Sequence, residues 1–443
     1  MPEPRISPLV IIVLRLLGRF YLFIFYGIAR IILRGEKELF EAFKRHLEGK
    51  SRCIIAFRHP NGGEPQLLSW FFLFRLRLLA GRAGIRLPRF PHAVFVYGYE
   101  VVRWGGWIAR LVMPNVGALP IHHSKLDREG MARIYKTIIE GPFPLALAPE
   151  GQVSYTTDSV PRLEQGVIRI GFGAADLMKS KGESAPLEIL PVAVHFRFGS
   201  WGRLTLEGLL RKIERYTGVN GRKLPLCERL KASRDVILVA NEKRYGLESN
   251  ENLLFEQRLN LVIVRALETT ERILGVKTGD NNLAGSRTTI PEEELFSRMY
   301  NLRQICWDRR ILPGVDTLDN HSGVERGIMD LRAGEAWYAG RHLELVDFAW
   351  YFRGPVPGDD EPLHHKIEYS QNLWDFANRT MGGAYSNRIS IFPRRVIIQT
   401  APVINLSERL LSYHEDKKAA IAKALSDLRD SYYKCINEVN KTD

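Results

Sequence analysis

The sequence predicts an α/β protein whose mixed, mostly parallel sheet is flanked by helices. Short apolar, β-prone runs at 53–57, 93–98, 116–121 and 187–198 alternate with amphipathic stretches of helical period. Parallel strands need long crossover connections, so this alternation favours a parallel sheet. A series of amphipathic helical segments follows at 216–390. With 443 residues, of which 45% are hydrophobic, the chain is long enough to bury a large core.

We expect four parts along the chain. Residues 1–50 form an N-terminal helical segment that associates with a membrane, and 51–215 form the α/β core. Residues 216–390 form a helical insertion or subdomain, because their apolar residues recur with helical spacing. Residues 391–443 return to the core with a strand-like run, RRVIIQTAPVINL, and a closing helix.

The apolar stretch at 6–33 indicates contact with a membrane surface. It is interrupted by Arg15, Arg19 and Arg30. An arginine at the centre of a membrane span costs about 2.5–3.5 kcal/mol on insertion scales, which disfavours a simple transmembrane helix. We expect an interfacial helix, or a pair of helices bent around Gly27, whose arginines extend to lipid head groups. The alternative is a buried core helix, although buried helices rarely carry three unpaired arginines.

The charge of the chain favours an anionic partner. The formal net charge is +13, which suits a phospholipid surface, a nucleic acid or a phosphorylated substrate. The stretch 67–90 contains five arginines and no acidic residue among its apolar side chains. It is typical either of an anionic bilayer surface or of a core helix with a solvated basic edge. No nucleic-acid-binding motif accompanies the charge, so we expect an anionic membrane as partner and no nucleic acid.

The cysteines indicate the compartment. The four cysteines are far apart and form no C-x-x-C pair. This pattern predicts free thiols in a reducing compartment and no zinc site. We therefore expect the protein on the cytoplasmic face of a membrane.

Two strand-then-loop segments carry candidate catalytic residues. In AFRHPNGGEPQ, His59 follows the apolar run at 53–57 and Glu64 lies five residues later, across a tight polar turn. A carboxylate that holds one imidazole nitrogen leaves the other free to act as a general base. In LALAPEGQVS, Glu150 follows another short apolar run. Ligands of α/β sheets bind at the carboxyl ends of the strands, where both loops are expected.

These segments resemble the motifs of the glycerolipid acyltransferase family, which includes the 1-acylglycerol-3-phosphate and glycerol-3-phosphate acyltransferases. His59 and Glu64 match its H-x4-D/E block, and PEGQVS, ending at Ser154, matches its P-E-G-x-x-S block. VGALPIHH is similar to its G-x-I-x-I-x-R block, and ILPVAVHF to its late V-P-V strand. Order and spacing agree across about residues 50–200.

The resemblance implies an acyltransferase core and an O-acyl transfer at a membrane surface. His59 would take the proton of an acceptor hydroxyl while Glu64 orients the ring. The acceptor would be a lyso-lipid or a glycerol phosphate, and acyl-CoA or acyl carrier protein would be the co-substrate, with no metal and no other cofactor. Backbone N–H groups near 61–63 are candidates to stabilise the oxyanion. The expected substrate-binding residues are Arg58, Asn61, His123, Pro149, Glu150, Gly151 and Ser154.

The chain departs from the family pattern at two phosphate-binding positions. His123 and Val153 stand where the family has arginines. Arginine binds phosphate through two hydrogen bonds, whereas valine offers none. Lys125, Arg128, Arg162 or Arg58 could replace them. The alternatives are therefore a non-phosphorylated lyso-lipid or amino-lipid acceptor, or an inert membrane-binding relative.

Overall fold

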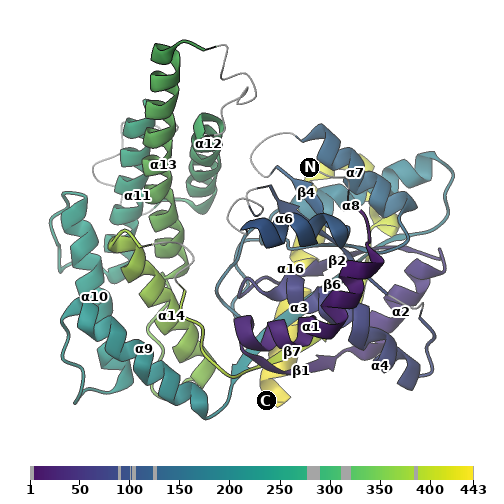
Figure 1. Cartoon of the computed structure of the whole chain (residues 1–443), viewed down its shortest axis with the longest axis horizontal. Helices are drawn as coiled ribbons and strands as arrows, with labels where there is room; N and C mark the ends of the chain where they lie inside the picture. The colour runs from purple at the N-terminus through teal and green to yellow at the C-terminus, as the bar shows by residue number, and fades with distance from the viewer. Residues whose placement is uncertain are drawn as a thin grey trace. The chain divides into compact units, whose positions relative to one another are not determined.

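The computed structural model describes residues 4–87, 91–99, 101, 106–122, 127–276, 290–310, 321–383 and 388–442. The chain forms two compact units (Figure 1). The first comprises Met1–Gly199 and Phe392–Asp443, and the second comprises Ser200–Ile391. The second unit thus begins before residue 216, where the sequence placed the start of the helical region.

The first unit is built on a mixed, mostly parallel sheet, which confirms the predicted α/β class. Its strand order is β1-β7-β6-β2-β5-β3-β4, and β8 pairs with β6. The pairs β1–β7, β2–β6, β2–β5, β3–β5 and β3–β4 are parallel, whereas β6–β7 and β6–β8 are antiparallel. The strands are β1 (Ile28–Arg34), β2 (Arg52–Phe57), β3 (Val94–Gly98), β4 (Leu119–Ile121), β5 (Leu145–Leu147), β6 (Leu187–Phe198), β7 (Arg394–Thr400) and β8 (Ile404–Asn405).

Helices cover both faces of this sheet, and the central strand β2 shows why. Its alternate residues point to opposite faces. Ile54 and Ala56 lie in one hydrophobic cluster, with residues of α7, α8 and α16. Ile55 and Phe57 lie in a second cluster, with residues of α2, α3 and the π-helix η1. The covering helices are α2 (Glu36–Leu47), α3 (Glu64–Trp70), η1 (Phe71–Leu76), α4 (Arg77–Arg82), α6 (Gly106–Asn115), α7 (Arg128–Glu140), α8 (Gly166–Ser180), α15 (Leu410–Glu415) and α16 (Lys417–Thr442).

The basic stretch after the first loop is a core helix with a solvated edge, which was the second of its two predicted alternatives. Leu68, Phe71 and Phe72 are buried, and the Phe72 ring stacks on that of Phe95 with centroids 6.5 Å apart. Arg75, on the same helical segment, is exposed. The buried apolar side chains of this stretch therefore stabilise the sheet, whereas Leu78, at 47%, is exposed beside the arginines.

The N-terminal stretch folds into a helix and a strand, so the predicted pair of helices is wrong. Helix α1 (Pro8–Tyr26) ends at Gly27, whose φ of 64° lies in the left-handed region that glycine adopts without steric cost. Strand β1 follows at once and pairs in parallel with β7. The backbone N–H and C=O groups of β1 pair there with those of β7. A helix at this position would leave the edge of β7 without these hydrogen bonds.

Helix α1 is apolar enough to associate with a membrane. Among the described helices, it is the one that length and composition would allow to cross a bilayer. Most of its large apolar side chains are exposed, including Leu16 at 72% and Phe20 at 64%. Arg15 is exposed as expected, but Arg19 donates to the backbone carbonyls of Ile28 (2.5 Å) and Ala29 (2.7 Å). Arg19 therefore joins the helix to the edge strand and does not extend to lipid head groups.

The second unit is helical in all its described elements. Buried ion pairs lie between its helices, such as Arg229 with Glu214 and Arg298 with Glu271. Its helices are α9 (Trp201–Thr217), α10 (Leu226–Arg244), α11 (Phe255–Leu274), α12 (Glu292–Arg310), α13 (Gly323–Tyr351) and α14 (Leu363–Thr380).

Truncation should separate the roles of α1 and β1. Removal of residues 1–26 deletes α1 and should leave the sheet folded. Removal of residues 1–34 deletes β1 as well and should expose the edge of β7. We expect the longer deletion to lower the thermal unfolding midpoint by several degrees more than the shorter one, since about 1 kcal/mol corresponds to about 2–4 °C in a domain of this size. Circular dichroism on both truncated proteins measures this, and equal midpoints would contradict the role given to β1.

Candidate active site

The loop after β2 holds a histidine and a glutamate in direct contact. His59 Nδ1 lies 2.6 Å from Glu64 Oε2, and the backbone N–H of Gly62 donates to the same oxygen at 2.8 Å. Gly62 has a φ of 96°, a left-handed conformation that lets the turn close. Because the carboxylate accepts a hydrogen bond, it favours the tautomer with hydrogen on Nδ1. Nε2 is then the basic nitrogen of the ring.

The environment of His59 raises its pKa. Burial alone would lower the pKa, because it disfavours the charged imidazolium. The hydrogen bond and the charge of Glu64, together with the charge of Glu150, outweigh burial and raise the pKa above its ordinary value. His46, His92 and His195 differ, since burial lowers the pKa of each to about 4. Among these histidines, His59 therefore has the imidazole best suited to exchange a proton near neutral pH.

The second predicted loop lies against the first. Strands β2 and β5 are parallel neighbours, so both loops leave the same edge of the sheet. Glu150 accepts a hydrogen bond from the backbone N–H of His59 (3.1 Å), and the backbone N–H of Ser154 donates to the carbonyl of His59 (2.9 Å). The Pro149 carbonyl accepts from the Glu164 N–H (2.6 Å), and Gly151 has a φ of 69°. The loops thus meet at the backbone of His59.

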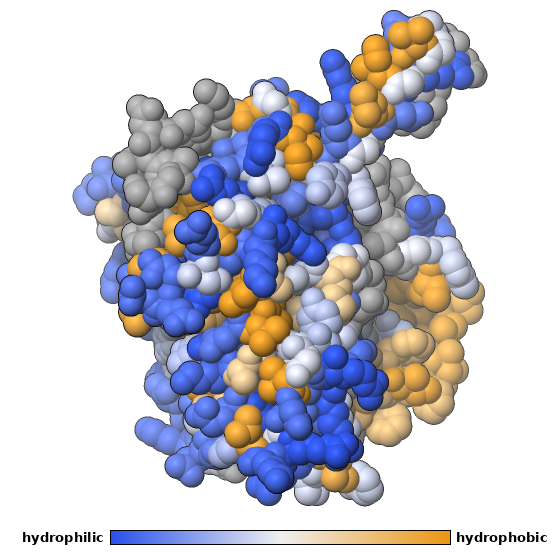
Figure 2. Space-filling model, turned by 90° about the vertical axis from the view of Figure 1, so that its left-hand side faces the viewer, coloured by the Kyte–Doolittle hydropathy of each residue, from blue (hydrophilic) through white to orange (hydrophobic). Residues whose placement is uncertain are grey.

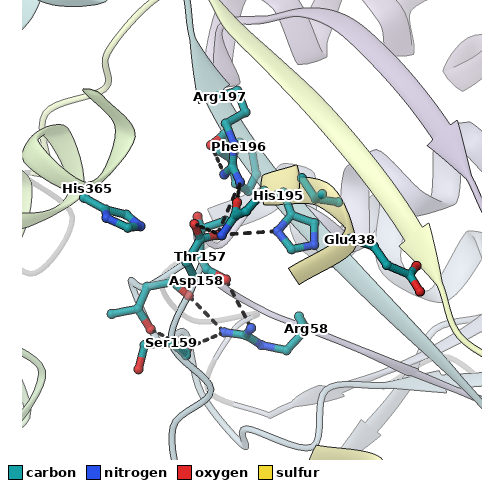
Figure 3. A network of polar contacts seen from close by, with 12 residues as sticks. Arg58, Thr157, Asp158, Ser159, His195, Phe196, Arg197, His365 and Glu438 are labelled. Carbon is teal, nitrogen blue, oxygen red and sulfur yellow. Dashed lines mark hydrogen bonds and ion pairs between the residues drawn. The ribbon is translucent and has the colours of Figure 1, made fainter. Parts of the chain in front are cut away.

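Arg58 does not face a substrate, contrary to the expectation from the sequence. Its side chain is 1% exposed and forms an ion pair with Glu150. Its guanidinium also donates to the carbonyls of Thr156 (2.9 Å), Thr157 (3.2 Å) and Ser159 (2.8 Å), as Figure 3 shows for the last two. Its buried side chain binds the second loop to the first. The same contacts give Glu150 a structural role in place of the substrate-binding role expected for it.

Asn61 has a partner that the sequence did not indicate. Its Oδ1 accepts a hydrogen bond from Arg394 Nη1 at 2.6 Å. Arg394 is 2% exposed and begins β7, far along the chain. Its backbone N–H also donates to the carbonyl of Gly27 at 2.7 Å. Nothing in its local sequence distinguishes it from other arginines, because only the closure of the sheet brings it to the loop after β2.

The predicted phosphate-binding positions are only partly described. His123 and Lys125 lie outside the described residues. Val153 lies beside the loop after β2, because a Cβ atom on Gly62 would be 3.7 Å from the Val153 Cγ2 atom. Arg128 is exposed at the start of α7. Of the two positions where the family has arginine, Val153 is therefore the one that the structure describes, and its side chain offers a phosphate no hydrogen bond.

A second histidine, His195, lies near Asp158 and Arg197, as Figure 3 shows. His195, on β6, is 0% exposed, and its Nδ1 lies 3.7 Å from Asp158 Oδ1. Burial lowers its pKa to about 4, although Asp158 acts in the opposite direction. His195 therefore stays neutral and supports the loop as a packing residue.

Comparison with known proteins adds no assignment. No protein-family model matches the sequence, and no curated protein is significantly similar to it.

Removal of one partner from the buried pair should destabilise the first unit. Glu150→Ala leaves the guanidinium of Arg58 buried without its counter-ion, which typically costs about 3–5 kcal/mol. A matched control is Glu129→Ala, because Glu129 pairs with Arg133 on the surface at 3.1 Å and should contribute little. Urea unfolding of both variants measures the difference, and a similar small effect in both would contradict the structural role of Glu150.

Proposed function

We propose that the protein is an O-acyltransferase that works at a membrane surface. It would move a fatty acyl group from an acyl thioester to a hydroxyl of a glycerol-phosphate or lysophospholipid acceptor. The observation that carries this proposal is the His59–Glu64 pair at the carboxyl edge of the sheet. The motif resemblance and the exposed apolar α1 support it.

The geometry suits general-base catalysis. His59 Nε2 takes the proton of the acceptor hydroxyl while Glu64 holds Nδ1 and stabilises the imidazolium that forms. The acceptor oxygen attacks the thioester carbonyl of acyl-CoA or acyl carrier protein and gives a tetrahedral oxyanion. Collapse of this intermediate forms the ester and expels the thiolate, which receives the proton from His59. General-base catalysis of this kind contributes about 10²–10⁴-fold to the rate.

The oxyanion requires donors other than the Gly62 amide. That N–H group already donates to Glu64. The neighbouring residue, Gly63, lies directly before α3. Its N–H group is the candidate donor to the oxyanion within this turn. The turn therefore divides its amides between the catalytic carboxylate and the reaction intermediate.

Two residues near the turn favour a second class of acceptor, one without a phosphate group. Arg58 is buried in the loop contacts, and the apolar Val153 lies beside Gly62. A non-phosphorylated lyso-lipid or amino-lipid would need no cation at this position. Arg128 and Arg162 remain as possible phosphate ligands among the described residues of the predicted set.

Substitutions at the catalytic pair test the proposal directly. His59→Ala should abolish acyl transfer to a panel of lyso-lipids, because it removes the base. Mass spectrometry of the products measures the transfer, and an unchanged circular dichroism spectrum should show that the variant is folded. Glu64→Gln should retain part of the activity, because an amide can still orient the ring but stabilises the imidazolium poorly. Near-normal turnover in His59→Ala would refute the assignment.

The pH dependence should reveal the effect of Glu64. The neutral form of His59 is the base, so activity should rise with pH through its raised pKa. Glu64→Gln removes the hydrogen bond to a carboxylate and the negative charge that raise this pKa. The acid limb of kcat/KM should therefore move to lower pH in the variant, as a pH–rate profile would show. An unmoved acid limb would contradict the role of Glu64.

An arginine at position 153 should report on the acceptor. If the native acceptor lacks phosphate, Val153→Arg should raise kcat/KM for lysophosphatidate relative to an uncharged lyso-lipid by about tenfold to a hundredfold, the effect of one charged hydrogen bond. Val153→Met controls for side-chain length. A wild type that already prefers lysophosphatidate, together with no gain in the variant, would favour the phosphorylated acceptor.

A further inference from the structure

Two helices of the first unit expose apolar side chains next to each other. Helix α6 exposes Trp107 (73%), Ile108 (56%) and Leu111 (55%). The backbone N–H groups of residues 5 and 7, just before α1, donate to the carbonyls of residues 114 and 115 at the end of α6, both at 2.8 Å. Figure 2 shows a hydrophobic patch at the right-hand edge of its view. The docking face consists of Leu9, Ile12, Val13, Leu16, Leu17, Phe20, Phe23, Ile24 and Phe25 of α1 with Trp107, Ile108 and Leu111 of α6.

The two helices are also packed together through their inner sides. Val10 and Leu14 of α1 share a small hydrophobic cluster with Val112 and Met113 of α6. The docking face is therefore one continuous part of the fold, and its outer side chains have no partner within this cluster.

The charge around the docking face selects its partner. Residues 4–27 contain no acidic residue, and two of their three arginines, Arg5 and Arg15, are exposed. The exposed Arg15 lies over the ring of Phe74 (6.0 Å to the centroid), and Arg75, which follows Phe74 in the chain, is also exposed. Apolar side chains surrounded by charge of one sign suit an anionic bilayer, where each basic residue near the surface adds about 1 kcal/mol. A protein partner of ordinary mixed charge would not match this pattern.

The last turn of α1 touches the catalytic loop. A Cβ atom on Gly63 would lie 2.5 Å from Cδ1 of Tyr26, so the tyrosine ring packs directly on this glycine. The next residue, Gly27, accepts the hydrogen bond from Arg394, which in turn holds Asn61. Both routes connect the end of α1 to the turn that precedes Glu64.

We propose that α1 and α6 dock on an anionic phospholipid bilayer and that Tyr26 transmits this docking to the catalytic loop. The inference rests on the proposed acyl transfer. A bilayer restrains α1 along its length, and the restrained helix holds the Tyr26 ring against Gly63. The turn between His59 and Glu64 contains two adjacent glycines, which do not define its conformation by themselves. Tyr26 is thus a positioning residue, which acts on His59 through the orientation of Glu64.

The test separates docking from its effect on catalysis. The full chain is assayed with a short-chain acceptor that stays in solution, with and without acceptor-free vesicles of phosphatidylglycerol and phosphatidylcholine. We expect the vesicles to raise kcat about tenfold, or ~1.4 kcal/mol in the barrier, with little change in KM for the soluble acceptor. Tyr26→Ala and Tyr26→Leu should bind vesicles as the wild type does but lose this stimulation. Tyr26→Phe, which keeps the ring, should retain it.

Binding through the docking face is measured separately, by flotation of the protein with vesicles. Leu16→Glu and Trp107→Glu should each weaken flotation, and Leu204→Glu, an equally exposed leucine of the second unit (66%), is the control. Unchanged flotation in the first two variants, or equal binding to vesicles of phosphatidylcholine alone, would overturn docking through this face.

The remaining outcomes distinguish the two proposals. If the wild type transfers acyl groups but vesicles leave kcat unchanged, or if Tyr26→Ala keeps the stimulation, the coupling is refuted and the proposed function stands. If the wild type transfers no acyl group to any acceptor, the proposed function fails, and the coupling fails with it.

Discussion

The arrangement of the site depends on the buried ion pair between Arg58 and Glu150. Each side chain is 1% exposed, so neither charge is compensated by water. Arg58 further binds three backbone carbonyls of the second loop, and the other oxygen of Glu150 accepts from the N–H group of His59. Buried charges persist in proteins when they are paired and hydrogen-bonded in this way. The two loops are consequently held together at Arg58 and at His59 itself.

Two glutamates act on His59 in different ways. Glu64 contacts the imidazole and, with the charge of Glu150, raises its pKa against the effect of burial. Glu150 contacts the backbone and sets the position of the residue. One carboxylate therefore controls the chemistry of the ring while the other controls where the ring is placed. The Pro-Glu-Gly loop, which the sequence suggested as a substrate-binding element, holds the backbone of His59 in the structure.

Helix α1 connects the surface of the first unit with its interior. Its outer side is apolar and exposed, whereas Leu22 packs in the core and Tyr26 packs on Gly63. The chain then turns at Gly27 into an edge strand of the sheet. The segment that the sequence predicts to lie at a membrane surface therefore also packs against the turn between His59 and Glu64. Through this contact, a restraint on α1 would act directly on the candidate catalytic pair.

The sequence by itself determined the features that depend on local pattern. Alternation of strand and helix signals predicted the α/β class, and the short spacing of His59 and Glu64 predicted their contact, because a tight turn can bring residues five apart together. Tertiary structure decided the features that depend on distant segments. The run at 28–34 became a strand because β7 offered a partner, and short apolar runs do not reveal such partners. Arg58 became a buried structural cation because Glu150 and the carbonyls of a remote loop enclosed it. Arg394 reached Asn61 because the last part of the chain returns to the sheet. The charge of an arginine can be read from the sequence, but whether it meets a substrate, a lipid or a buried carboxylate depends on what the fold packs around it.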